Sequence, residues 1–428
     1  LLGLTPTDYD VATDATPDRV RALFRRSCEV GAHFGVVLVR VLPAEIDPND
    51  LPAGAGEPDA DARAGIVVEV ATFRSDGPYS DRRRPDAVTF STPEDDAHRR
   101  DFTINALFLD PLAPPEAPGV RGRVIDYVGG RADLAKKIVR AVGDPEARLA
   151  EDHLRALRAV RFAARLGFDI EPATGEAIRR HARDLVGVSR ERIGDEVRRM
   201  LSHPARARAA ALLASLDLDA PTLGITLSDA GLRTLMELGA APALPNELAA
   251  IWRAGFGSEG APIERPPFPA ALAAMLSHEL AGGASRGGSS GTLRASLVLS
   301  NDEHAALRDT LDALARLRTD WPALEVAARK RLAARPAFVE ALRILRADDP
   351  DRARAIAEEV ETLAADGVGL APPPLVTGDH LVDRGHRPGP AFKGVLDATY
   401  DAQLEGAIKS PKEGILFAGR LLGGASGA

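Results

Sequence analysis

The sequence is poor in cysteine, in aromatic residues and in long hydrophobic runs. Its 428 residues include one cysteine, Cys28, so the chain cannot form an internal disulfide bond. Nothing near Cys28 in the sequence supplies a base, and we expect a buried thiol rather than a nucleophile. No apolar run approaches the length of a membrane-spanning helix and no signal peptide is recognisable, so we expect a cytoplasmic protein without a membrane partner.

The sequence also lacks an excess of positive charge. Its 54 Lys and Arg residues are outnumbered by 62 Asp and Glu residues, which gives a formal net charge of -8. This charge argues against a protein that coats polyanions in general, but it permits a nucleic-acid enzyme whose basic residues gather on one surface. The chain begins Leu1-Leu2 without Met, as a fragment would.

We predict an α+β protein in four parts. A small N-terminal head with a mixed β-sheet occupies residues 1–134, with a loop insertion at 43–65 that is rich in Pro, Gly, Ala and Asp. A helical neck follows at 135–220. A helical body and tail at 221–366 contains a Gly/Ser-rich flexible linker at 282–291, and a short module at 367–428 completes the chain.

The secondary structure expected in these parts follows from capping residues and periodicity. In the head, Thr16 as N-cap and Pro17 as first helical residue predict a helix at 16–24, and β-branched runs predict strands at 36–39 and 66–71. Beyond the head, apolar spacing near 3.6 residues predicts helices at 151–166, 173–185, 189–201, 206–216, 229–238, 301–317, 322–333, 336–346 and 350–365.

Two carboxylates near the start of the chain, Asp8 and Asp10, form the first candidate site. In an extended strand, residues two apart project from the same face, so both side chains would point together. Paired carboxylates suit Mg²⁺, whose remaining ligands are often water and phosphate oxygens. The alternative is a solvated turn, since Thr-Pro-Thr-Asp is also favourable turn chemistry.

The second candidate site is the octamer Arg99-Arg100-Asp101-Phe102-Thr103-Ile104-Asn105-Ala106. Its two arginines could neutralise phosphate, and Asp101 and Asn105 would share a face if the segment is helical. The alternative is a simple N-terminal helix turn that Asp101 caps and that buries Phe102 and Ile104. The octamer alone favours neither.

The third candidate site lies on the helix that we expect to begin at Glu151. Asp152 and Arg155, three residues apart, would stand side by side and could hydrogen-bond to the Watson–Crick edge of C or A, but not of G or U. The alternative is an intrahelical ion pair on a solvated face. Arg158, Arg161 and Arg165 extend the basic stripe, which could track a nucleic-acid backbone or merely solvate the helix.

The nine histidines are scattered and include His98, His153, His181 and His203. No paired His-Asp metal motif is evident in the helical half, so an attached phosphohydrolase is not indicated. We expect most of these histidines to be surface or packing residues.

Motifs in a fixed order identify a family. The sequence resembles the class II tRNA nucleotidyltransferases (CCA-adding enzymes) and bacterial poly(A) polymerases, of the DNA polymerase beta superfamily, over about its first two hundred residues. The shared motifs are Asp8-Tyr9-Asp10, Gly31-Ala32-His33-Phe34-Gly35, Glu69-Val70-Ala71-Thr72-Phe73-Arg74, Arg99-Arg100-Asp101-Phe102-Thr103-Ile104-Asn105-Ala106, Asp126-Tyr127-Val128-Gly129-Gly130-Arg131 and Glu151-Asp152-His153-Leu154-Arg155.

The resemblance implies a role for each matching residue. Asp8 and Asp10 would bind two Mg²⁺ ions, with Glu69 as third catalytic carboxylate. Arg100, Asp101 and Asn105 would contact the ribose and phosphates of the nucleotide, and Asp152 and Arg155 would select the base. Arg158 and Arg161 would be further nucleotide-binding residues. Arg192 and Glu196 would brace the nucleotide-selecting helix, and residues 76–81 would form a mobile loop.

The implied activity is the addition of C and A, from CTP and ATP, to the 3′ end of tRNA, with release of pyrophosphate. The Gly31-Ala32-His33-Phe34-Gly35 segment resembles the tRNA enzymes more than the poly(A) polymerases. An A-adding or polyadenylating enzyme stays open, as does a less favoured non-catalytic RNA-binding protein. Members carry Gly-Gly-x-Val-Arg-Asp before Leu-Leu-Gly, and this segment does not precede Leu1 in the sequence, as expected of a truncated sequence. If the protein does begin at Leu1, nucleotide binding should be weak.

Overall fold

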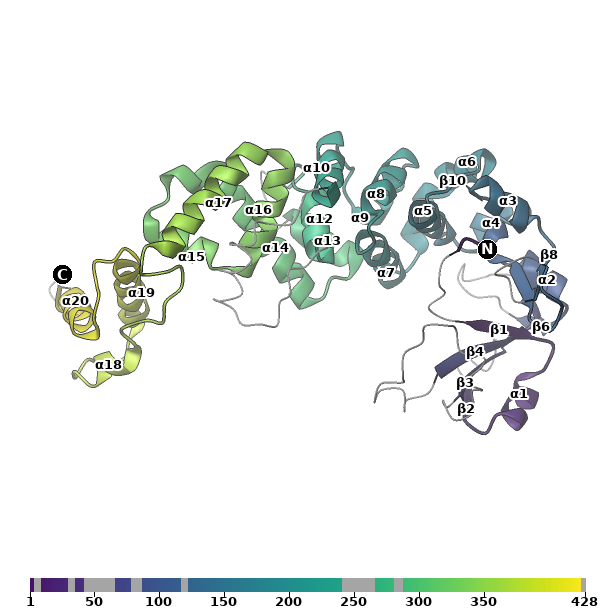
Figure 1. Cartoon of the computed structure of the whole chain (residues 1–428), viewed down its shortest axis with the longest axis horizontal. Helices are drawn as coiled ribbons and strands as arrows, with labels where there is room; N and C mark the ends of the chain where they lie inside the picture. The colour runs from purple at the N-terminus through teal and green to yellow at the C-terminus, as the bar shows by residue number, and fades with distance from the viewer. Residues whose placement is uncertain are drawn as a thin grey trace. The chain divides into compact units, whose positions relative to one another are not determined.

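A computed structural model of the chain describes residues 1–3, 9–29, 35–41, 66–77, 87–116, 122–240, 266–280 and 288–424 (Figure 1). The predicted insertion at 43–65 and most of the predicted mobile loop at 76–81 lie outside these residues. The chain divides into two compact units, Leu1–Val188 and Ser189–Ala428. The division falls inside the segment that we predicted as a neck.

The first unit contains a four-stranded mixed sheet, with strand order β1-β4-β3-β2. β1 runs parallel to β4, whereas β3 is antiparallel to both β4 and β2. The strands span β1 (Asp10–Thr13), β2 (Ser27–Glu29), β3 (Val36–Val41) and β4 (Ile66–Thr72).

One face of this sheet is apolar and is covered by helix α1 (Pro17–Leu23). Val20 of α1 packs with Val37, Val39 and Val70, which project from the same face because they alternate along their strands. The helix begins at the predicted N-cap, Thr16. The opposite face, which we call the open face, carries the exposed residues Asp10 and Glu69.

Smaller sheets and short helices complete the first unit. β5 pairs with β6, β7 with β8, and β9 with β10. These elements are β5 (Arg74–Asp76), β6 (Val88–Phe90), α2 (Pro93–His98), η5 (Thr103–Asn105), β7 (Leu107–Asp110), β8 (Arg123–Asp126), α3 (Gly130–Lys136), β9 (Ile138–Val139), α4 (Pro145–Glu151), α5 (Arg155–Leu166), β10 (Asp169–Ile170), α6 (Pro172–His181) and η6 (Ala182–Gly187).

The second unit is helical throughout its described residues, and the predicted α+β class is confirmed. Its α-helices are α7 (Arg190–Leu201), α8 (Arg206–Ser215), α9 (Asp219–Leu223), α10 (Asp229–Ala240), α12 (Phe268–Met275), α13 (Gly288–Leu297), α14 (Asn301–Ala315), α15 (Val326–Ala333), α16 (Pro336–Asp348), α17 (Pro350–Ala365), α18 (Gly378–Val382), α19 (Pro390–Leu404) and α20 (Pro411–Gly424). A π-helical turn, η7 (Arg316–Asp320), and a 3-10 turn, η8 (Trp321–Ala323), join α14 to α15.

Two expectations about this architecture are wrong. The predicted linker at 282–291 is helical at its last four residues, because α13 begins at Gly288 and buries Leu293 and Leu297; residues 282–287 lie outside the described part of the chain. Cys28 is exposed on β2 rather than buried, since it lies on the open face of the sheet.

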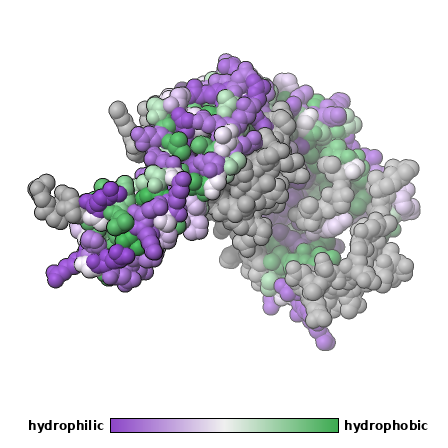
Figure 2. All heavy atoms as spheres, turned by 60° about the vertical axis from the view of Figure 1, so that its left-hand side comes forward, coloured by the Kyte–Doolittle hydropathy of each residue, from purple (hydrophilic) through white to green (hydrophobic). Residues whose placement is uncertain are grey.

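The surface is mixed in character. Hydrophilic side chains alternate with small hydrophobic patches over the C-terminal helices that come forward in Figure 2. Exposed apolar residues there include Val382, Leu416 and Leu421. Among the described residues, no helix has the length and apolar character needed to cross a bilayer.

Candidate functional site

The open face of the main sheet carries two of the predicted carboxylates. Asp10 of β1 lies directly opposite Glu69 of β4 in the parallel register, and both residues are exposed. Neighbouring strands lie about 4.8 Å apart, so paired residues project side by side on one face. Hard oxygen ligands in this arrangement fit a divalent cation such as Mg²⁺. Asp8, the third predicted carboxylate, lies outside the described residues.

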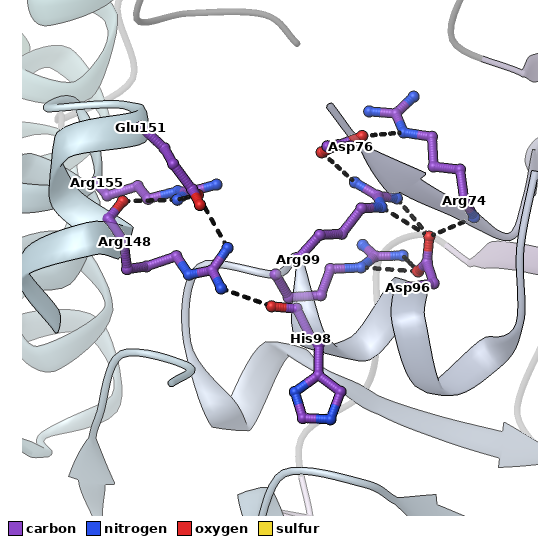
Figure 3. A network of polar contacts seen from close by, with 9 residues as sticks. Arg74, Asp76, Asp96, His98, Arg99, Arg148, Glu151 and Arg155 are labelled. Carbon is purple, nitrogen blue, oxygen red and sulfur yellow. Dashed lines mark hydrogen bonds and ion pairs between the residues drawn. The ribbon is translucent and has the colours of Figure 1, made fainter. Parts of the chain in front are cut away.

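The predicted phosphate-binding arginines are both held by Asp96, a residue that the sequence reasoning missed (Figure 3). One oxygen of Asp96 accepts from Nε of Arg99 at 2.9 Å and from Nη2 at 2.6 Å. The other oxygen accepts from Nε of Arg100 at 3.1 Å and from Nη2 at 2.8 Å. Asp96 is 1% exposed, so two fork-shaped pairs fix both guanidinium groups around one buried carboxylate.

Chain connectivity joins this arginine pair to the sheet. β4 leads directly into β5, where the backbone N–H of Arg74 donates to Asp96 at 3.3 Å. Arg74 Nε donates to Asp76 at 3.0 Å, and Arg99 lies 3.7 Å from the same carboxylate. Asp76 is the first residue of the predicted mobile loop, so this loop starts from a fixed ionic anchor.

Asp101 lies at a junction between the head and α5. Its Oδ1 accepts from the N–H of Phe102 at 2.8 Å and from Nδ2 of Asn105 at 3.0 Å, and its Oδ2 accepts from Arg158 at 2.7 Å. Burial raises the pKa of Asp101, but Arg158 and the other donors outweigh it and leave the pKa below its usual range. Asp101 is therefore an ionised, preorganised group.

Asp101 and Asn105 meet for a reason other than the predicted one. The segment is not an α-helix: it is extended at Phe102 and turns as a 3-10 helix at Thr103–Asn105. The amide of Asn105 reaches back across this turn to the carboxylate. The juxtaposition is as expected, although the backbone that produces it is different.

The prediction of one continuous helix that begins at Glu151 is wrong. Glu151 ends α4, Asp152 is its C-cap with an extended backbone, and α5 begins at Arg155. Asp152 is therefore not one turn before Arg155 on a continuous helix. Its side chain accepts from the N–H of Leu154 at 3.1 Å, and its backbone carbonyl accepts from the N–H of Arg155 at 3.0 Å.

Arg155 is positioned by Glu151 and Arg148 (Figure 3). Its Nη1 donates to the Glu151 carboxylate and, at 2.7 Å, to the carbonyl of Arg148. Arg148 also pairs with Glu151 at 2.9 Å and donates to the carbonyl of His98 at 2.7 Å. These bonds connect the start of α5 to the end of α2, next to the two arginines held by Asp96.

Two arginines of the predicted stripe, Arg158 and Arg161, are not simply solvated, whereas the third, Arg165, is exposed. Arg161 is 9% exposed and its guanidinium lies 4.3 Å from the centre of the Phe162 ring. Arg158 is partly buried and is engaged with Asp101. The alternative of a merely solvated helix face is therefore wrong for both.

Arg192 and Glu196 lie one turn apart on α7, at the beginning of the second unit. Glu196 is 3% exposed, and its carboxylate lies 3.6 Å from Arg199. Their predicted role as a brace for α5 stays a prediction.

The motif Asp126-Tyr127-Val128-Gly129-Gly130 lies at the start of α3, which contacts η5. Asp126 accepts four backbone N–H groups, from Val128, Gly129, Gly130 and Arg131, at 2.9–3.1 Å. Burial raises the pKa of Asp126, but these donors hold it below its usual range. They fix the start of α3, where Gly130 packs against the η5 backbone that follows Asp101.

The sheet carboxylates suit a divalent cation, and the arginines held by Asp96 suit phosphate oxygens. Residues 1–140 match the family described as the Poly A polymerase head domain, and residues 167–221 match one described as the probable RNA and SrmB- binding site of polymerase A. Residues 1–140 are therefore similar to this family of head domains.

The relatives agree with this assignment. The chain is 38% identical over 234 residues to the CCA-adding enzyme of Geobacillus stearothermophilus, covering 54% of this chain and 50% of that protein. It is 40% identical over 203 residues to the CCA-adding enzyme of Bacillus subtilis (strain 168), covering 47% and 43%. The match thus spans about half the length of these curated relatives.

Solved structures match over more of the chain. The crystal structure of Bacillus stearothermophilus CCA-adding enzyme in complex with CTP has a TM-score of 0.68 at 27% identity, over 100% of this chain and 92% of that chain. Thermotoga maritima CCA-adding enzyme complexed with tRNA_CCA has a TM-score of 0.62 at 17% identity, over 99% and 88%, which shows a shared fold. Members of the nucleotidyltransferase family generally use divalent metal ions.

Proposed function

We propose that this chain is a template-independent RNA nucleotidyltransferase that adds C and A, from CTP and ATP, to the 3′ end of tRNA. The observation that carries the proposal is the in-register pairing of Asp10 and Glu69 on the exposed sheet face of a nucleotidyltransferase head. The naming of the curated relatives as CCA-adding enzymes supports tRNA as the substrate. A tRNA substrate also implies a cytoplasmic location.

Asp10 and Glu69, with Asp8, would hold Mg²⁺. When bound, Mg²⁺ supplies charge that lowers the pKa of an RNA hydroxyl and stabilises oxygens of the leaving pyrophosphate. The strands fix the spacing between the two carboxylates before any ligand arrives, because their backbones are hydrogen-bonded in register.

Arg99 and Arg100 would face the triphosphate. Asp96 sets the orientation of both guanidinium groups. Together Asp96 and Asp76 carry two negative charges against the three positive charges of Arg74, Arg99 and Arg100, which leaves one positive charge for an anionic ligand. Asp101, Asn105 and Arg158 would contact the ribose and phosphates as one hydrogen-bonded group.

Asp152 and Arg155 would select the base. Arg155 carries further donors besides the Nη1 that is bound to Glu151 and Arg148, and Asp152 supplies an acceptor from the extended segment between α4 and α5. Such a donor and acceptor match the edges of C and A.

The test is incorporation of radiolabelled CTP and ATP, separately and together, into a tRNA that lacks its CCA end. We expect C addition from CTP alone, complete CCA addition from the mixture, and loss of both in Glu69→Gln. The exposed-acid variant Asp302→Asn, in the second unit, is the control and should behave as wild type. No incorporation by a chain that contains the upstream Gly-rich segment would overturn the proposal.

A second candidate is an A-adding or polyadenylating enzyme, which is favoured only by the description of the head-domain family as that of a poly(A) polymerase. It predicts incorporation of A without C in the same assay. A homopolymeric A tail on RNA other than tRNA would favour it over CCA addition.

A further inference from the structure

A cluster of metal-ligating side chains lies away from the carboxylates of the sheet. His153 lies between α4 and α5, His181 ends α6, and Asp184 lies in η6. One ligand atom from each of these residues falls within 4.8 Å of the others. These residues are distant in sequence and form no paired His-Asp sequence motif; packing brings them together.

The contacts of His181 define how the cluster is organised. Its Nδ1 lies 2.8 Å from Asp184 Oδ2, and its Nε2 lies 3.0 Å from Glu146 Oε2. A neutral imidazole carries one N–H, so it can donate to only one of these carboxylates. If Nε2–H donates to Glu146, Nδ1 presents a lone pair on the side of Asp184.

Glu146 is itself held in place, because Arg180 Nε donates to it at 2.7 Å. A carboxylate that accepts the distal N–H of a ligating histidine fixes the ring tautomer and orientation, as in many zinc sites. The ring of His153 lies 5.5 Å from that of His181, tilted by 31°. The second imidazole thus approaches the same point.

Burial and ligand type indicate the kind of cation. His153 is 3% exposed, whereas the side chains of His181 and Asp184 are 21% and 43% exposed, so the cluster has a buried wall and an opening to solvent. Two imidazole nitrogens and one carboxylate oxygen suit Zn²⁺ or Co²⁺, while Mg²⁺ prefers an oxygen shell.

We propose that His153, His181 and Asp184 form a three-ligand site for a divalent transition metal such as Zn²⁺, with Glu146 orienting His181. The metal joins the segment between α4 and α5 to the end of α6. Because His153 adjoins Asp152, the bound metal restrains the backbone that presents a base-selecting side chain. The metal site itself does not depend on the proposed function, whereas its link to base selection rests on it.

The test uses the full chain, stripped of metal with a chelator and titrated with Co²⁺ and then Zn²⁺. We expect a visible Co²⁺ absorption band of tetrahedral type at one equivalent, which Zn²⁺ abolishes. His181→Gln and Asp184→Asn should both lose the band, whereas Glu146→Gln should weaken Co²⁺ binding about 10- to 100-fold. The side chain of Asp184 is 43% exposed, so its variant should fold even if His181→Gln does not.

Two controls separate this site from others. His98→Gln, which changes an exposed histidine outside the cluster, should keep the band. Asp10→Asn/Glu69→Gln, which removes the sheet carboxylates, should keep it as well. Absence of a band in the wild-type chain would show that His181 only bridges Glu146 and Asp184 as an ion pair. A band that survives in Asp184→Asn would show that Co²⁺ binds without this ligand, and would also overturn the proposal.

Discussion

At the scale of single residues, Asp96 decides how two arginines are presented. It is buried, carries a single charge, and is bonded to both guanidinium forks. A charge in this position persists only because it is paired and fully hydrogen-bonded. Asp96 is thus a positioning residue for Arg99 and Arg100, and the first prediction tests that role.

Asp96→Asn should raise the KM for both CTP and ATP about tenfold, equivalent to about 1.4 kcal/mol of binding, because Arg99 and Arg100 lose their shared partner. Steady-state incorporation assays measure it. The control is Asp95→Asn, which changes the exposed neighbour on α2 and should leave KM unaltered. A variant with a lower melting temperature but unchanged KM would assign Asp96 a role in folding alone.

Asp101 should contribute pH-dependent stability. Its folded pKa lies below its usual value, so the stabilisation is complete above the unfolded pKa of about 3.9 and is lost as pH falls through the folded pKa. Asp101→Asn should lower the free energy of unfolding at pH 7 by about 2 kcal/mol. Denaturant titrations should show this difference shrinking below about pH 4; a difference that does not change with pH would exclude the ionic contribution.

Asp152→Ala should relax discrimination against GTP and UTP, because the acceptor that excludes their edges is removed. Binding of Mg²⁺ at the sheet should stay intact, since Asp10 and Glu69 are unchanged. Competition between CTP and each noncognate nucleotide measures the effect. Selectivity equal to that of the wild type would mean that Asp152 serves only the backbone turn before α5.

At the scale of elements, the contact between α3 and η5 places the Asp101 segment. A Cβ on Gly130 would lie 2.1 Å from the carbonyl oxygen of Thr103. This is a backbone atom and cannot rotate away, so one of the two elements must shift. Asp126, which fixes the start of α3, limits that shift.

Gly130→Ala should therefore destabilise the first unit by about 1–3 kcal/mol, the usual cost of overpacking. Gly187→Ala is the matched control, because nothing lies within 4 Å of its added Cβ. Thermal melts of the two variants compare the costs directly. Equal melting temperatures would show that α3 moves freely relative to η5.

Some elements were predictable and others were not, for physical reasons. α1 and α17 begin where capping residues and Pro place them, and β3 and β4 follow β-branched runs, because these signals are local. The break between α4 and α5 was missed, since Glu151 to Arg155 has helical composition. Arg148 pairs with Glu151 and donates to the carbonyl of His98 at the end of α2. The turn therefore depends on a contact between segments that are distant in the sequence.

At the scale of the whole molecule, the chain is acidic, with a net charge of -8. If it binds tRNA, a local basic surface must overcome this repulsion, and binding must release counterions from the RNA. The affinity for tRNA should therefore fall by about 10³-fold or more between about 50 and 200 mM salt if several phosphates are contacted. Filter binding at several KCl concentrations measures this slope. Affinity that is independent of salt would contradict backbone recognition.

The sequence by itself determined the class of fold, most of the helices and the residue types of the site, because capping, periodicity and motif order are properties of short segments. Only the tertiary structure decided which side chains meet. The register that sets Asp10 opposite Glu69, the burial of Asp96 between two arginines, and the approach of His153 to His181 all depend on contacts between distant segments. Such contacts are selected by packing and burial, and no local pattern encodes them.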